Sequence, residues 1–109
     1  MKYSVFTIPP FERQVKRLAK KFPSLNAEYL ALIEDLEENP KKGTHLGNNC
    51  YKIRFAIASK GRGKSGGARV ITYFYIEKDA VFLLAIYDKS ENADISDKEL
   101  RELLLEIEE

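Results

Sequence analysis

Residues 59–69 read SKGRGKSGGAR and combine four glycines with four cations, which are Lys60, Arg62, Lys64 and Arg69. A loop that is both flexible and positive is costly to order unless it binds something negative. Its GKS triplet does not form a phosphate-binding P-loop, because Ala58 stands where that pattern needs a glycine. The loop also leads into ARVITYFYI, which is typical of a strand and not of a helix. These residues therefore suggest that side chains of the loop bind an anion.

Charge is distributed unevenly along the chain. Of the 109 residues, with a net charge of +1, residues 40–76 contain eight basic side chains and no acidic one. Residues 77–109 contain four basic and eleven acidic side chains. A long block without a carboxylate predicts an anion-binding surface. The alternative is a solvated face that the acidic C-terminal third neutralises.

Composition and length indicate one globular domain over residues 1–109. The chain is 44% apolar and 32% charged, and it has neither a signal peptide pattern nor an apolar run of about 20 residues. A single cysteine, Cys50, excludes an internal disulfide, and one cysteine with one histidine is too few for a zinc centre. We expect a cytoplasmic protein without a membrane segment, a metal or another cofactor.

Hydrophobic periodicity predicts an α+β domain in the order β-α-α-β-β-β-α. The predicted strands cover residues 2–8, 50–58, 68–76 and 80–87, and the predicted helices cover 11–22, 25–38 and the residues from 97 onward. The last helix opens with the capping box SDKE at residues 96–99. Residues 41–49, KKGTHLGNN, are predicted to be a polar connection, and the strand 80–87, apolar on both faces, is expected to be central. The first two helices should form a hairpin on one face of a small, mainly antiparallel sheet.

The cations are expected to gather on the other face of this sheet. In CYKIRFAIA the apolar residues alternate with Lys52 and Arg54, so these two should share the open face. Arg69 begins the paired strand, and Lys89 follows the last strand. The aromatics available nearby are Tyr73, Tyr75 and Tyr87. Cations interleaved with aromatics suit single-stranded RNA, although ordinary strand packing is the alternative for the first two tyrosines.

Three segments carry a resemblance to a known family. The strand CYKIRF, the loop GRGKSGGARVI and the segment LLAIYDKSENADIS resemble the HigB-type branch of the RelE toxins. The resemblance covers residues 49–97, and the preceding helical hairpin fits it in length and order. It implies a RelE-like fold and a ribosome-dependent endoribonuclease of a type II toxin–antitoxin system. It also implies cleavage of mRNA in the ribosomal A site and an antitoxin partner, for which we expect an acidic or helix-turn-helix segment.

The chemistry implied by this resemblance needs no metal. The ribose 2′-OH attacks the adjacent phosphate, which requires a base, cations around the phosphorane and an acid for the leaving oxygen. His45 is expected to be structural or exposed, and a lysine crowded by other cations gives up its proton more readily. We therefore expect four catalytic residues, namely Lys64, Arg69, Tyr87 and Lys89, and four RNA-binding residues, namely Lys52, Arg54, Lys60 and Arg62.

The sequence departs from the family pattern at one point. The C-terminal tyrosine that serves chemistry in some RelE proteins falls near Ile95 here. Either Tyr87 or a lysine takes that role, or the protein cuts poorly. A non-catalytic or degenerate binding module of the same fold is therefore an alternative. A gyrase-inhibiting ParE-like toxin is another, and the basic block weighs against it.

The loop carries two further expectations. Its four glycines, including Gly66 and Gly67, should keep it mobile until RNA or a partner binds, so that replacing this pair by alanine weakens cleavage more than folding. Arg69 and Lys64 are treated as exposed charges, whose loss should leave the melting temperature nearly unchanged.

Overall fold

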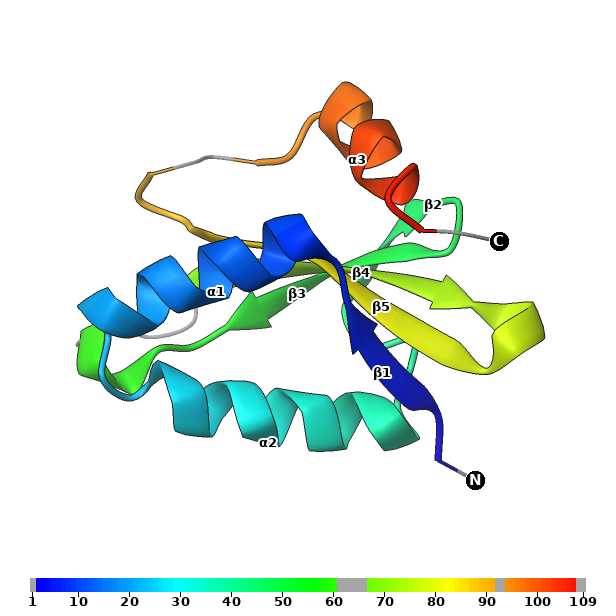
Figure 1. Ribbon diagram of the computed structural model, residues 1–109. Coiled ribbons are helices and arrows are strands. Elements are labelled where there is room, and N and C mark those ends of the chain that lie inside the picture. The colour runs from blue at the N-terminus through cyan, green and yellow to red at the C-terminus, as the bar shows by residue number, and fades with distance from the viewer. Residues whose placement is uncertain (1, 61–66, 92–93, 108–109) are drawn as a thin grey trace.

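The computed structural model describes residues 2–60, 67–91 and 94–107 (Figure 1). Its strands are β1 (Ser4–Thr7), β2 (Thr44–Gly47), β3 (Cys50–Phe55), β4 (Ala68–Tyr75) and β5 (Ala80–Asp88). Its helices are α1 (Pro9–Lys21), α2 (Leu25–Glu38) and α3 (Asp97–Leu104), with short 3-10 turns η1 (Ala58–Lys60) and η3 (Ile76–Lys78). This is the α+β fold expected from the sequence, with both N-terminal helices in the predicted places.

The five strands form one sheet in the order β1-β5-β4-β3-β2. Neighbouring strands are antiparallel except for β1 and β5, which are parallel. The middle strand is β4, while β5, expected to be central, lies between β1 and β4. Its neighbours on both sides and its cover on both faces explain why nearly every residue of β5 is buried.

Strand β2 was not expected, since residues 41–49 were predicted to be a polar connection. Gly47 pairs with Cys50, so Asn48 and Asn49 form a two-residue hairpin loop between β2 and β3. Both asparagines have positive φ, at 53° and 61°, the geometry that Asn tolerates in the tight turns favoured by hairpins. The strand lies at the sheet edge with its first residues exposed, and it therefore lacks the apolar alternation that marks a half-buried strand.

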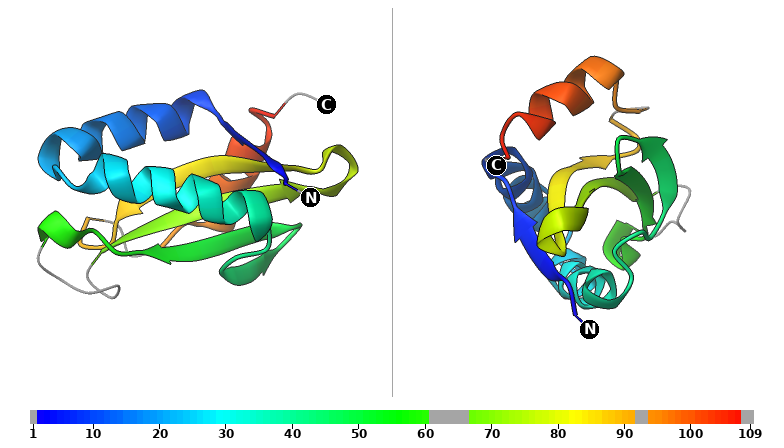
Figure 2. Two further views of the ribbon diagram at one scale, coloured as in Figure 1. Left: turned by 90° about the horizontal axis from the view of Figure 1, so that it is seen from below. Right: turned by 90° about the vertical axis from the view of Figure 1, so that its right-hand side faces the viewer.

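The two N-terminal helices pack side by side on one side of the sheet (Figure 2). Prolines 9 and 10 end β1 and also supply the first residues of α1, where a missing N–H costs nothing. Helix α1 buries Phe11 and Leu18, and α2 buries Leu25, Leu32 and Leu36. Helix α3 lies on the opposite side of the sheet from α2 (Figure 1). The face that α3 partly covers is the one that carries the predicted site residues.

Candidate functional site

Strand pairing brings three of the predicted site residues into one row. Arg54 on β3 pairs with Arg69 on β4, which in turn pairs with Tyr87 on β5. Side chains directly opposite one another on neighbouring strands lie about 5 Å apart at Cβ. Lys52 lies two residues before Arg54 and therefore on the same face. We call Lys52, Arg54, Arg69 and Tyr87 the site cluster.

The two arginines of the site cluster differ in exposure. Arg54 is exposed at the end of β3, whereas Arg69 is only 5% exposed on the middle strand. The Nη1 of Arg69 donates to the carbonyl oxygen of Ala68 at 3.0 Å. The expectation that Arg69 is an exposed charge was therefore wrong, because strands on both sides enclose it. It provides a fixed cation at the floor of the cluster, with Arg54 at its rim.

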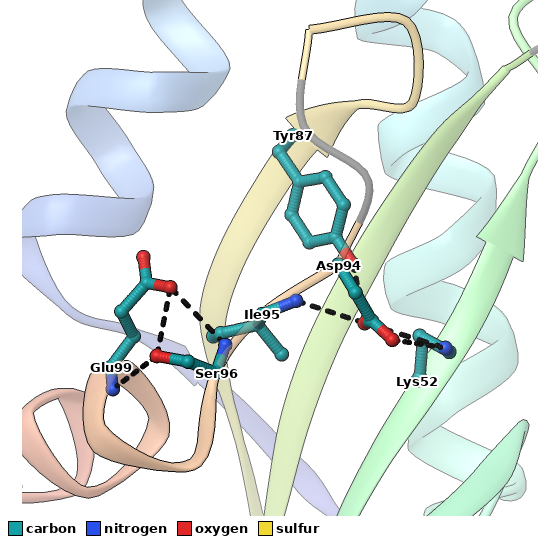
Figure 3. A network of polar contacts seen from close by, with 6 residues as sticks. All are labelled: Lys52, Tyr87, Asp94, Ile95, Ser96 and Glu99. Carbon is teal, nitrogen blue, oxygen red and sulfur yellow. Dashed lines mark hydrogen bonds and ion pairs between the residues drawn. The ribbon is translucent and has the colours of Figure 1, made fainter.

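A carboxylate that the sequence analysis did not single out lies within the site cluster (Figure 3). Lys52 Nζ lies 3.4 Å from both carboxylate oxygens of Asp94. The hydroxyl of Tyr87 donates to Asp94 Oδ1 at 3.3 Å, and the N–H of Ile95 donates to the same oxygen at 2.9 Å. The Ile95 N–H, together with Lys52, lowers the pKa of Asp94 below its usual range. Asp94 is therefore ionised at neutral pH.

The surroundings of Lys52 differ from those predicted from the sequence. The lysine was predicted to stand on an open face, but it is half-buried and has a carboxylate partner 42 residues further along the chain. The acidic C-terminal third thus neutralises part of the basic block, which was the alternative that the charge distribution left open. The acidic C-terminal third indicated that such a partner could exist. The sequence did not indicate which of its carboxylates would pair with Lys52.

Tyr87 is buried within the site cluster, with 7% of its surface exposed. Burial, and next the charge of Asp94, raise the pKa of its hydroxyl to about 12. The hydroxyl is therefore protonated at neutral pH and can donate a hydrogen bond. A ring this enclosed offers no face on which an RNA base could stack.

An acidic cleft of about 290 Å³ borders both Tyr87 and Asp94. Its lining also includes Ile95 and three glutamates, which are Glu99, Glu102 and Glu106. Ser96 starts α3 with the predicted capping box, in which Ser96 Oγ accepts the N–H of Glu99 at 3.1 Å. Three glutamates make this cleft unsuitable for a phosphate. Tyr87 therefore marks the boundary between a basic and an acidic region.

The start of the glycine-rich loop is anchored to the corner between α1 and α2. Glu28 Oε2 accepts the N–H of Ala58 at 2.7 Å, and Ser24 Oγ accepts the N–H of Ser59 at 3.0 Å. Ser24 Oγ also donates to Glu28 Oε1 at 3.0 Å. The two contacts to Ala58 and Ser59 were not anticipated, because their partners lie at least 30 residues away in the sequence. Two site residues of the loop, Arg62 and Lys64, lie outside the described residues, as does the side chain of Lys60.

The end of the loop is fixed by a close approach between backbones. Gly67 is buried, and a Cβ added to it would clash with the carbonyl oxygen of Phe55. Its own carbonyl accepts the N–H of Lys89 at 3.1 Å. The expectation that Gly67 keeps the loop mobile was therefore wrong, because alanine at this position would disturb the pairing of β3 with β4. Lys89 is exposed and lies beside this end of the loop.

The remaining candidates belong to the packing of the molecule. Tyr73 and Tyr75 are half-buried, with ring centroids 5.9 Å apart, and Tyr73 lies beside Leu104, the last residue of α3, and Ile107 beyond it. His45 is exposed on β2 with its ring 5.1 Å from that of Tyr51. Cys50 is fully buried, which raises the pKa of its thiol to about 11 and leaves it protonated and inert at neutral pH.

In residues 2–60, 67–91 and 94–107 no group of three or more His, Cys, Asp or Glu side chains is placed to hold a metal ion. Within the same ranges, none of the helices has the length and apolar character required to cross a bilayer.

Comparisons with known proteins identify the family and the fold of this chain. A family model described as RelE toxin of RelE / RelB toxin-antitoxin system matches residues 10–106. A double arginine-to-alanine mutant of the E. coli toxin RelE in the free state superposes with a TM-score of 0.66 at 17% identity, covering 99% of this chain and all of that one. The isolated E. coli RelE toxin gives 0.56 at 19% identity, covering 94% of this chain and 97% of that one.

A third solved structure is a complex. The toxin–antitoxin complex RelBE2 of Mycobacterium tuberculosis contains a chain that superposes with a TM-score of 0.59 at 18% identity. The match covers 81% of this chain and 99% of that one. These likenesses show that the fold is RelE-like.

Proposed function

Because this chain belongs to the RelE toxin family, we propose that it is an mRNA endoribonuclease of the HigB type, formed by a single domain over residues 1–109. It acts on mRNA in the ribosomal A site, and an antitoxin protein holds it inactive. The observation that carries the proposal is the row of Arg54, Arg69 and Tyr87 on three adjacent strands. This row brings two permanent cations and one proton donor together on neighbouring strands.

The row supports cleavage by attack of the ribose 2′-OH. The bond between the 2′-oxygen and phosphorus forms, the bond from phosphorus to the 5′-oxygen breaks, and the products are a 2′,3′-cyclic phosphate and a 5′-hydroxyl. Arg69 and Arg54 stabilise the negative charge of the phosphorane, and burial makes the guanidinium of Arg69 more effective than an exposed one. Tyr87, protonated at neutral pH, is placed to supply the proton that the leaving 5′-oxygen takes up.

The removal of the 2′-OH proton is assigned to a lysine. Lys64 and Lys89 were the candidates from the sequence, and Lys89 lies exposed beside the loop end that precedes Arg69. Lys52, Lys60 and Arg62 are proposed to hold neighbouring phosphates of the mRNA. Phosphate contacts of this kind give RNA binding its salt dependence.

A second function is supported by one specific observation. Asp94 pairs with Lys52, and Ile95 lies where the resemblance places a catalytic tyrosine. Both features fit a degenerate toxin that binds the ribosome or an antitoxin without cutting RNA. The experiment below separates these two functions.

The test is a reconstituted translation reaction in which ribosomes carry a defined codon in the A site. We expect the purified chain to cut the mRNA within that codon and to leave a 2′,3′-cyclic phosphate, which enzymatic end-mapping detects. The same mRNA without ribosomes should stay intact. If translation stops while the mRNA remains whole, the chain is a binding module and the nuclease proposal is wrong.

The partner proposal follows from the family and from the M. tuberculosis complex, which contains a toxin with its antitoxin. We infer that this chain binds an antitoxin of the RelB type. Co-expression with the small protein encoded beside it should restore growth and yield a stable complex on purification. A stable free chain from its native locus, with no co-purifying protein, would contradict the inference.

A further inference from the structure

The site cluster contains an anion that belongs to the chain itself. Asp94 presents two oxygens on one atom, as a phosphate does, and both lie 3.4 Å from Lys52 Nζ. One of them also accepts the hydroxyl of Tyr87 at 3.3 Å (Figure 3). These two donors come from β3 and β5, while Asp94 comes from the connection between β5 and α3.

The surroundings of Asp94 show how it could leave this position. Its side chain is 59% exposed, whereas that of Lys52 is 28% exposed. The carboxylate can therefore turn into solvent while the lysine stays in place. Exposed ion pairs of this kind contribute little to stability. A phosphate that also reached Arg54 and Arg69 would make more charge-assisted hydrogen bonds than the carboxylate it replaces.

We propose that Asp94 occupies a phosphate position of the site and competes with RNA for Lys52 and Tyr87. The inference rests on the proposed function for its RNA ligand, but it concerns the regulation of the site by the chain's own carboxylate. In the free protein the charge of Lys52 is neutralised internally. RNA must displace Asp94 before it can bind that lysine. This competition weakens the binding of RNA segments that do not also contact Arg54 and Arg69.

The opposite role for Asp94 makes a different prediction. If the carboxylate positions Tyr87 and Lys52 for catalysis, its loss should weaken binding or cleavage. If it competes with RNA, its neutralisation should strengthen binding. The sign of the effect therefore separates the two roles.

The decisive variant is Asp94→Asn, which removes the charge and keeps an oxygen to accept from Ile95 N–H and Tyr87 O–H. The probe is a 2′-O-methyl RNA oligonucleotide, which cannot be cleaved, and binding is followed by fluorescence anisotropy across a salt series. We expect binding at 0.15 M salt to become about two- to fivefold tighter, which is the upper part of the range for one exposed ion pair. The slope of log K against log salt should steepen by about 0.7, because Lys52 then neutralises one more RNA phosphate, which releases its condensed counterion.

The matched control is Glu91→Gln. Glu91 lies in the same connection, carries the same charge and pairs with Arg17 of α1 at 3.3 Å, outside the site cluster. This variant changes the net charge equally and should alter RNA binding by less than about twofold. If Asp94→Asn does not fold, Asp94→Ser replaces it, since its hydroxyl can still accept the N–H of Ile95.

A second probe separates this inference from the proposed function. Inorganic phosphate, followed by amide chemical shifts of β3 and β5, should also bind Asp94→Asn more tightly than the wild-type protein. If the variant gains affinity for phosphate but neither protein binds RNA, Asp94 does occupy a phosphate position, and the RNA function is wrong. If RNA binds and Asp94→Asn behaves like Glu91→Gln or binds more weakly, the inference is overturned and the RNA function stands.

Discussion

Tyr87 separates a basic region from an acidic one, and the two regions are built from different kinds of structure. On the basic side, Arg69 projects from the middle strand of the sheet, with Arg54 beside it on β3. On the acidic side, Glu99 and Glu102 project from α3, the last helix, and Glu106 follows its end. A strand bonded on both sides fixes its side chains in register, whereas a short terminal helix is held only by its cap and one apolar face.

Burial shows the same contrast. Arg69 is 5% exposed and Tyr87 is 7% exposed, so the basic side includes groups from the interior of the molecule. In α3 only Leu100 is buried, while Leu103 and Leu104, and Ile107 just beyond the helix, are partly buried. The site cluster is therefore built into a well-buried part of the fold. The opposing charges lie on a segment with fewer buried side chains, which we expect to open more easily.

The largest effect is expected from breaking the basic side at Arg69. Arg69→Ala should lower mRNA cleavage by about 10²–10³-fold, because a buried, oriented cation that stabilises the phosphorane is lost. Since the side chain is buried, the variant should also lose about 1–3 kcal/mol of unfolding free energy, contrary to what an exposed charge would give. Cleavage rates in the programmed-ribosome reaction and urea unfolding measure the two effects.

Two controls accompany this variant. Arg69→Lys keeps the charge without the planar fork and should retain part of the activity. Lys42→Ala removes a cation of the same basic block that pairs with Asp35 at 2.6 Å on the surface, and it should change cleavage by less than about twofold. If Arg69→Ala cuts at the wild-type rate when equal amounts of folded protein are compared, the site cluster is not the catalytic site.

A smaller effect should appear at the boundary itself. Burial, Asp94 and Glu99 raise the pKa of Tyr87, whereas Arg69 lowers it, so this pKa reports the balance between the two regions. Its folded value of about 12 lies above the ordinary value of 10. The neutral hydroxyl therefore stabilises the fold below pH 10, and this contribution is lost as pH rises from 10 to 12.

Tyr87→Phe should remove this part of the alkaline loss of stability. Urea unfolding of both proteins at pH 8, 10 and 11 measures it, and the difference in unfolding free energy between them should shrink as pH rises. A parallel loss in both proteins over this range would show that Tyr87 has an ordinary pKa. The pKa of Tyr87 would then not depend on the charges of the basic and acidic regions.

Some features of the two regions could be predicted from the sequence, and others could not. Alternation in CYKIRF was enough to place Lys52 and Arg54 on one face, and the box at residues 96–99 was enough to start α3. Both depend on neighbours within a few residues. The bounds of α2 were predicted for the same reason, since its apolar residues repeat at helical spacing.

The features that the sequence analysis missed depend on contacts between distant segments. The partnership of Lys52 with Asp94 joins residues 42 positions apart, and the fixed position of Gly67 depends on the backbone at Phe55. Burial of Arg69 follows from the strand order, which places β4 in the middle. No local pattern gives the order of strands in a sheet, so these features required the fold.

The smallest effect is expected from removing the N-terminal cap of α3, the helix that carries part of the acidic region. Ser96 Oγ accepts the N–H of Glu99 at 3.1 Å, and Glu99 Oε1 accepts the N–H of Ser96 at 3.1 Å. Ser96→Ala removes the first of these bonds, which typically costs about 1 kcal/mol. Hydrogen exchange in α3 should then become about fivefold faster, while exchange in β4 and β5 should stay unchanged.

Glu102→Gln is the matched control, because it alters the same helix without touching the cap. It should leave exchange in α3 within about twofold of the wild-type rate. Native-state exchange resolved by residue distinguishes the two possible behaviours of the helix. If Ser96→Ala speeds exchange in α3 and in the central strands by the same factor, α3 opens only when the whole domain unfolds. The acidic side would then be as firmly held as the basic one, and the contrast between the two regions would lie in their charge alone.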